Sequence, residues 1–162
     1  MSTAMSNGQV IVIDDEEIVR ESMIQTLELE GYQAVAFENP KDALALCSGS
    51  WQGVIICDVR MDIMDGLQVL EQVLNSDFAL EGEVIAAIAT RCSHALDDTS
   101  LMHLFLERLA NGKAGQAGFS RVLADLMFTP ELRLQAFSAF RNPERSEALS
   151  AAIGEMFGGR MG

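Results

Sequence analysis

The first part of the chain alternates short apolar runs with segments of helical periodicity. Val10 to Ile13 is a run of four β-branched apolar residues, which is typical of a strand buried on both faces. Residues 16–30 then repeat apolar side chains at four-residue spacing, so they are predicted to form an amphipathic helix that ends at Gly31. Alternation of this kind indicates βαβ units around a parallel sheet.

Two further strands and two further helices continue this pattern. Residues 33–37 and 54–57 are the predicted strands. Asn39-Pro40 predicts the start of a helix running toward Ser48, because asparagine caps helices and proline suits the first helical position. Residues 66–75 are predicted to form the third helix. The expected fold class is therefore α/β, with a flavodoxin-like parallel sheet of strand order 2-1-3.

The second half of the chain has a mainly helical pattern. Residues 83–90 (EVIAAIAT) are compatible with a fourth buried strand and with a helix, since periodicity does not separate the two in short apolar runs. Residues 101–110 and 119–128 are predicted helices, and the glycine-rich segment 111–118 between them is a predicted loop or hinge. Two dipeptides are also predicted to open helices, Thr129-Pro130 and Asn142-Pro143.

These elements predict four segments along the chain. They are an N-terminal tail over residues 1–8, an α/β domain over 9–90, a helical region over 91–157 and a frayed C-terminus over 158–162.

Charge and hydropathy exclude several classes of partner. The net charge is −13, with thirteen acids and three bases in residues 1–75 and eleven acids and eight bases in residues 76–162. Because neither half is basic, no binding to nucleic acid or anionic membranes is expected. No apolar run has the length of a membrane span, and the N-terminus lacks the pattern of a signal peptide, so the predicted location is cytoplasmic.

The cysteines and histidines do not suggest a metal site. Cys47, Cys57 and Cys92 are odd in number and lack metal-ligand spacing, so we expect small, buried thiols in a reducing compartment. His94 and His103 are nine positions apart, which suits ordinary helix residues better than shared metal ligands.

Three carboxylates follow the predicted strands. Asp14 and Asp15 end the first strand, and Asp58 ends the third. Because these strands are neighbours in a 2-1-3 sheet, the three side chains should meet at its carboxyl edge, where open α/β sheets place their sites. Clustered carboxylates repel one another unless protonated or bound to a cation, and oxygen ligands favour Mg²⁺. A magnesium site is therefore expected there.

Residues 9–75 resemble the receiver domain of two-component response regulators, especially receivers of the enhancer-binding activator class. The resemblance lies in IVIDDEEIVRESMIQTLELEGYQAVAFENPKDALAL and in VIICDVRMDIMDGLQVL. It implies that Asp58 accepts a phosphoryl group from a sensor histidine kinase or a phosphotransfer protein. It also implies that Mg²⁺ is held by Asp14, Asp15, Asp58 and the backbone carbonyl of Arg60.

The chain departs from the family pattern in three places. Asp62 replaces the proline that follows Arg-Met in the family. Receivers also end strand four with Ser or Thr, and Thr90 is the candidate if residues 83–90 form a strand. They end strand five with Lys-Pro, but the candidate Lys113 follows no apolar strand and precedes no proline, so a solvated loop lysine is the better interpretation.

A sheet that ended at the third strand would have an open apolar edge, which folded proteins rarely leave uncovered. Residues 83–90, the C-terminal helices or a second copy of the chain are the candidates to cover it.

Three functions are consistent with these features to different degrees. The favoured one is a phosphorylation-dependent module, not a conventional enzyme, whose helical half passes the signal on through protein contacts. The alternative is a degenerate receiver that binds partners or dimerises without switching. A phosphohydrolase with an Asp-x-Asp motif is disfavoured, because Glu16 and Arg60 stand two positions after Asp14 and Asp58.

Overall fold

The computed structural model describes residues 7–47, 51–58, 60–61 and 65–158. The chain divides into two compact units, one up to Leu70 and one from Glu71 onward. The sequence predicts an α/β domain that extends to residue 90. In the structure residues 71–90 belong to the helical unit instead. Asp62 of the receiver pattern and most of the predicted frayed end lie outside the described residues.

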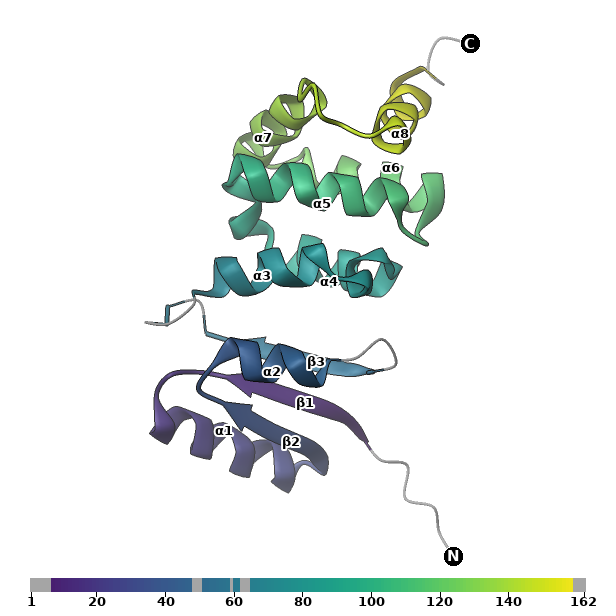
Figure 1. Ribbon diagram of the computed structural model, residues 1–162. Coiled ribbons are helices and arrows are strands. Elements are labelled where there is room, and N and C mark those ends of the chain that lie inside the picture. The colour runs from purple at the N-terminus through teal and green to yellow at the C-terminus, as the bar shows by residue number, and fades with distance from the viewer. Residues whose placement is uncertain (1–6, 48–50, 59, 62–64, 159–162) are drawn as a thin grey trace, which may run out of the picture. The chain divides into compact units, whose positions relative to one another are not determined.

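The N-terminal unit is built on a three-stranded parallel sheet of order β2-β1-β3, as the sequence predicts (Figure 1). The central strand β1 pairs on both sides, and Ile13 is in register with Phe37 of β2 and Cys57 of β3. Residues 10–13 of β1 are buried, which explains their continuous apolar run. The bounds of the strands are β1 Asn7–Ile13, β2 Tyr32–Phe37 and β3 Gly53–Cys57.

Two helices connect the three strands. Helix α1 (Glu17–Leu29) packs against β1 and β2, and α2 (Pro40–Leu46) does the same. Ala43 of α2 shares a core with Ile11 and Ile13 of β1. Because parallel crossovers are right-handed and the chain reverses direction across the sheet after β2, the two helices lie on opposite faces.

Local signals place the ends of these helices where the sequence predicts. Gly31 has a φ of 84°, the left-handed conformation that ends α1. The Asn39 side chain accepts a hydrogen bond of 2.9 Å from the Lys41 backbone N–H and so caps α2.

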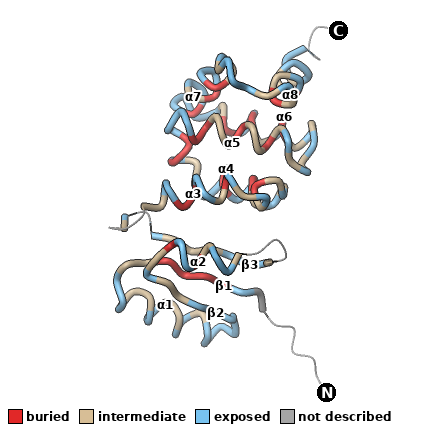
Figure 2. The backbone as a smooth tube through the Cα atoms, in the orientation of Figure 1, coloured by how far each residue is buried: buried red, intermediate tan, exposed pale blue. Residues whose placement is uncertain are grey.

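The C-terminal unit is a helical assembly around α5. Helix α5 packs against α4, α6, α7 and α8 and is buried along one side (Figures 1 and 2). Among the described residues, no helix is long and apolar enough to cross a bilayer. The elements after β3 are α3 Gly66–Asn75, which spans the division between the units, η1 Asp77–Leu80, α4 Gly82–Arg91, η2 Ser93–Asp97, α5 Thr99–Asn111, α6 Gly115–Leu126, α7 Pro130–Phe140 and α8 Glu147–Gly158.

Residues 83–90 are helical, so the candidate fourth strand is wrong. They lie within α4, where Ile85 and Ile88 are both buried. A spacing of three residues places these side chains on one face of a helix but on opposite faces of a strand. The sheet therefore has three strands in the described part of the chain.

The predicted loop over residues 111–118 is shorter in the structure. Helix α5 continues to Asn111, and α6 begins at Gly115, which has a φ of 64°. Gly118 lies inside α6, where a Cβ atom would be 2.6 Å from the Cβ of Ala114. The glycines thus permit a sharp turn and a tight first helical turn, and do not make a long hinge.

The two later Xaa-Pro dipeptides behave differently. Pro130 opens α7 as predicted, but Asn142-Pro143 does not open a helix. Its Asn142 side chain accepts a hydrogen bond of 2.9 Å from the Glu144 N–H and makes a turn. Helix α8 is capped instead by Ser146, whose Oγ accepts from the Leu149 N–H at 3.1 Å.

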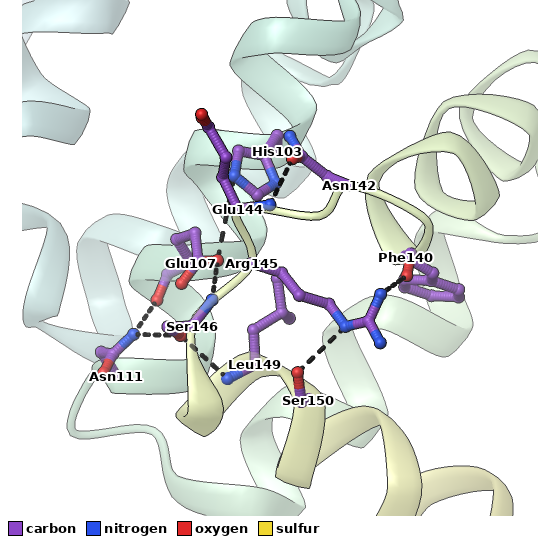
Figure 3. Close-up of polar contacts among 10 residues, drawn as sticks. All are labelled: His103, Glu107, Asn111, Phe140, Asn142, Glu144, Arg145, Ser146, Leu149 and Ser150. Atoms are coloured by element: carbon purple, nitrogen blue, oxygen red, sulfur yellow. Dashed lines mark hydrogen bonds and ion pairs between the residues drawn. The ribbon is translucent and has the colours of Figure 1, made fainter.

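A polar cluster ties the start of α8 to α5. The Ser146 N–H donates to Glu107 Oε1 at 2.8 Å, and the Asn111 side chain donates to the Glu107 carbonyl at 2.8 Å (Figure 3). His103 Nε2 lies 3.9 Å from Glu107 Oε1, while its buried Nδ1 has no hydrogen-bond partner among the described residues. Glu107 therefore fixes the chain where it enters α8.

Cys47, Cys57 and Cys92 form no disulfide with one another and are half-buried. Burial raises the pKa of the Cys47 and Cys92 thiols above the ordinary value, which keeps them protonated near neutral pH.

Removal of a core aromatic side chain should destabilise the helical unit strongly. Phe105 of α5 is fully buried, so Phe105→Ala should lower the free energy of unfolding by about 3–5 kcal/mol. Phe128 is 80% exposed, and Phe128→Ala should change it by less than about 0.5 kcal/mol. Urea unfolding followed by far-UV circular dichroism measures both; equal effects would contradict the packing described.

Loss of the Glu107 carboxylate should destabilise the same unit to a smaller extent. Glu107→Ala leaves the Ser146 N–H without its acceptor, which should cost about 1–3 kcal/mol. Glu155→Ala, at an exposed position of α8, is the matched control and should be nearly neutral. The same urea titration compares them, and a neutral Glu107→Ala variant would refute the role given to this carboxylate.

Candidate carboxylate site

Three carboxylates meet at the carboxyl edge of the sheet. The side-chain oxygens of Asp14, Asp15 and Asp58 offer ligand atoms that all lie within 4.8 Å of one another. Asp14 and Asp15 follow β1 and are partly buried, whereas Asp58 follows β3 and is exposed. The structure thus brings together the three acids that the sequence singles out.

The backbone holds these acids in place as continuations of the sheet. The Asp58 N–H donates to the Ile13 carbonyl at 2.9 Å, which extends the pairing of β3 with β1 by one residue. The Asp14 N–H donates to the Phe37 carbonyl at 3.2 Å and extends the pairing with β2. Each acid therefore starts its loop from a fixed backbone position.

The side chain of Asp14 is oriented further by the start of α1. Its Oδ1 accepts a hydrogen bond of 2.8 Å from the Glu16 N–H. Arg20, one turn into α1, donates from Nη1 to the Asp14 carbonyl at 2.8 Å. Sequence patterns alone do not reveal this role of Arg20, because a cation in the first turns of an amphipathic helix is ordinary on a solvated face.

The donor set and its spread are compatible with Mg²⁺. Magnesium prefers oxygen ligands at about 2.1 Å, so oxygens on opposite sides of the ion lie about 4.2 Å apart. Neighbouring ligands of such an octahedral ion lie about 3.0 Å apart. The three carboxylates, whose ligand atoms lie within 4.8 Å of one another, would therefore move closer together to bind one ion. Arg60 lies two residues after Asp58 and is exposed. That its backbone carbonyl binds the metal ion stays a prediction.

The two switch candidates do not belong to this site's unit. Thr90 lies on α4, where its Oγ1 donates to the Ala86 carbonyl at 2.9 Å as helix-surface threonines do. The condition for its role, a strand over residues 83–90, is not met. Lys113 lies in the turn between α5 and α6, exposed and paired with Glu81, in keeping with a solvated loop lysine. Both residues are part of the helical unit.

Known proteins similar to this chain fall into the response-regulator class. The C4-dicarboxylate transport transcriptional regulatory protein DctD of Rhizobium meliloti is 42% identical over 77 residues, covering 48% of this chain and 16% of that protein. The DNA-binding transcriptional regulator NtrC of Salmonella typhimurium is 35% identical over 69 residues, covering 43% and 15%. The response regulator MprA of Mycolicibacterium vanbaalenii is 33% identical over 64 residues, covering 40% and 28%. The chain therefore spans a minor part of each relative's length.

A solved structure shares this similarity. The response regulator receiver protein from Pseudomonas putida is 30% identical, with a TM-score of 0.42, covering 47% of this chain and 64% of that one. The curated relatives, together with the 2-1-3 sheet, confirm the predicted resemblance, so the N-terminal unit is receiver-like.

A family model matches most of the chain and spans both units. It is described as a protein of unknown function (DUF3549) and aligns with residues 24–157. The chain therefore belongs to this family of unknown function, and its N-terminal unit is a receiver-like domain of the response-regulator kind.

Proposed function

We propose that this protein is a phosphoryl-accepting signalling module in which Asp58 takes a phosphoryl group from a sensor histidine kinase or a phosphotransfer protein. The observation that carries the proposal is the convergence of Asp14, Asp15 and Asp58 within 4.8 Å at the carboxyl edge of the sheet. A cytoplasmic location and the lack of conventional enzymatic turnover are parts of the same proposal.

Asp58 has the properties that the acceptor needs. Its side chain is exposed, so a large donor can reach it, while its backbone is fixed by the hydrogen bond to Ile13. In the proposed step a carboxylate oxygen of Asp58 bonds to phosphorus as the phosphorus–nitrogen bond of the donor's phosphohistidine breaks. The electron pair of that bond goes to the imidazole nitrogen, and Asp58 is left as an acyl phosphate.

The proposed role of Asp14 and Asp15 is to hold a magnesium ion beside Asp58. Together with Asp58 and the Arg60 carbonyl they would hold Mg²⁺, which when bound offsets the negative charge of the phosphoryl oxygens. The hydrogen bond from the Glu16 N–H keeps Asp14 oriented, and Arg20 fixes the Asp14 carbonyl. Catalysis in this proposal is therefore mainly positioning and electrostatics.

Output is proposed to pass through protein contacts of the helical unit. In this proposal neither Thr90 nor Lys113 reports the phosphoryl group. Thr90 donates to the Ala86 carbonyl within α4, and Lys113 is paired with Glu81. A partner protein or a second copy of the chain is the proposed recipient of the signal.

Intact mass spectrometry after incubation with Mg²⁺ and acetyl phosphate tests the proposal. We expect an increase by the mass of one phosphoryl group, abolished by Asp58→Asn and by chelation of Mg²⁺. Asp42→Asn, at an exposed acid of α2 outside the carboxylate cluster, is the matched control and should retain the adduct. A folded wild-type protein without adduct would contradict phosphoryl acceptance and leave a non-switching binding module; an adduct on Asp58→Asn would move the acceptor elsewhere.

A further inference from the structure

Hydrogen bonds hold Asp14 at its backbone N–H, at its carbonyl and at one side-chain oxygen. The N–H donates to the Phe37 carbonyl at 3.2 Å, and the carbonyl accepts from Arg20 Nη1 at 2.8 Å. The Oδ1 atom accepts from the Glu16 N–H at 2.8 Å. Among the described residues Oδ2 has no hydrogen-bond partner, so it is the oxygen of Asp14 that remains for a cation.

The side chain of Arg20 closes the connection between β1 and α1. Its backbone N–H donates to the Glu16 carbonyl at 3.1 Å inside the helix, while its guanidinium reaches back to the Asp14 carbonyl. Because the Asp14 carbonyl and the Asp15 N–H share one rigid peptide plane, this contact also sets the direction in which the chain enters Asp15. Arg20 therefore fixes both acids that follow β1.

Helix α1 has few other specific contacts at this end. No residue of α1 is buried, and its N-cap residue Glu16 makes no side-chain capping hydrogen bond. Thr26 Oγ1 donates to the Ser22 carbonyl, which lies within the same helix. The hydrogen bond from Arg20 is thus a specific link between the start of α1 and the acids at the end of β1.

We propose that Arg20 is a positioning residue of the cation site, which presents Asp14 Oδ2 and the Asp15 carboxylate in the arrangement that a divalent cation requires. The inference rests on the proposed magnesium site at the carboxylate cluster. Arg20 acts through Asp14 and does not touch the ion. Loss of a group that holds a metal ligand in place typically weakens metal binding about ten- to a hundredfold.

The charge of Arg20 acts in the opposite direction. Its guanidinium lies within about 7 Å of the Asp14 carboxylate, because the carbonyl that it contacts belongs to the same residue. A positive charge at this distance repels a divalent cation and weakens its binding a few-fold. Removal of Arg20 therefore strengthens cation binding if only its charge matters, and weakens cation binding if its hydrogen bond matters more.

Titration with Mn²⁺ at fixed pH and ionic strength tests the inference, with the free ion measured by electron paramagnetic resonance. Mn²⁺ takes the oxygen ligands that suit Mg²⁺. Arg20→Met removes the charge and the donor but keeps a flexible side chain with good helix propensity, and it should weaken Mn²⁺ binding about tenfold. Arg20→Lys keeps the charge and a donor, so its Mn²⁺ affinity should lie between those of Arg20→Met and the wild type.

Lys41→Met is the matched control. Lys41 is an exposed base in the first turn of α2, which follows β2 as α1 follows β1. The variant loses the same charge but no hydrogen bond to a carboxylate residue, so its Mn²⁺ affinity should equal or slightly exceed that of the wild type.

The sign of the change decides between position and charge. An unchanged or higher Mn²⁺ affinity of Arg20→Met, in a variant shown to be folded by far-UV circular dichroism, would overturn the role of Arg20 and leave the proposed metal site standing. A wild-type chain that binds no Mn²⁺ would overturn both. If Arg20→Met does not fold, Arg20→Lys decides: an affinity equal to that of the wild type would show that charge alone matters.

Discussion

The parallel pairing of β1 with β3 is the interaction on which the candidate site depends. It aligns Ile13 with Cys57, and one residue later it brings Asp58 beside the acids that follow β1. The apolar residues of β1 are buried, and the free energy gained by burying them offsets the repulsion between the carboxylates at the edge of the sheet. A shift of register by one residue would turn every side chain of β3 to the other face and separate the carboxylates.

The α/β unit could be predicted closely because its signals are local and agree with one another. The run from Val10 to Ile13, the stop at Gly31 and the cap at Asn39 each specify one feature, and together they lead to a 2-1-3 sheet. The three carboxylates follow from that topology. What could not be predicted is the orientation of Asp14, since Arg20 reaches its carbonyl from a position that sequence does not mark.

The helical unit was harder to predict because its contacts link distant residues. Arg108 of α5 donates from Nε to the Leu74 carbonyl at 2.6 Å. This carbonyl lies in the last turn of α3, where the helix itself offers no hydrogen-bond donor. Ser146, not Asn142-Pro143, opens α8, because Glu107 fixes its N–H from 39 residues away. Residues 83–90 were ambiguous in isolation, and their burial among helices decides between strand and helix.

The location of a divalent cation in crystals grown with Mn²⁺ tests the central claim most directly, because Mn²⁺ takes the oxygen ligands that suit Mg²⁺ and scatters anomalously. The account predicts an anomalous peak at the carboxyl edge of the sheet, within bonding distance of carboxylate oxygens from Asp14 or Asp15 and from Asp58. Well-ordered side chains at this edge with no peak beside them, or a peak bound elsewhere on the chain, would contradict it.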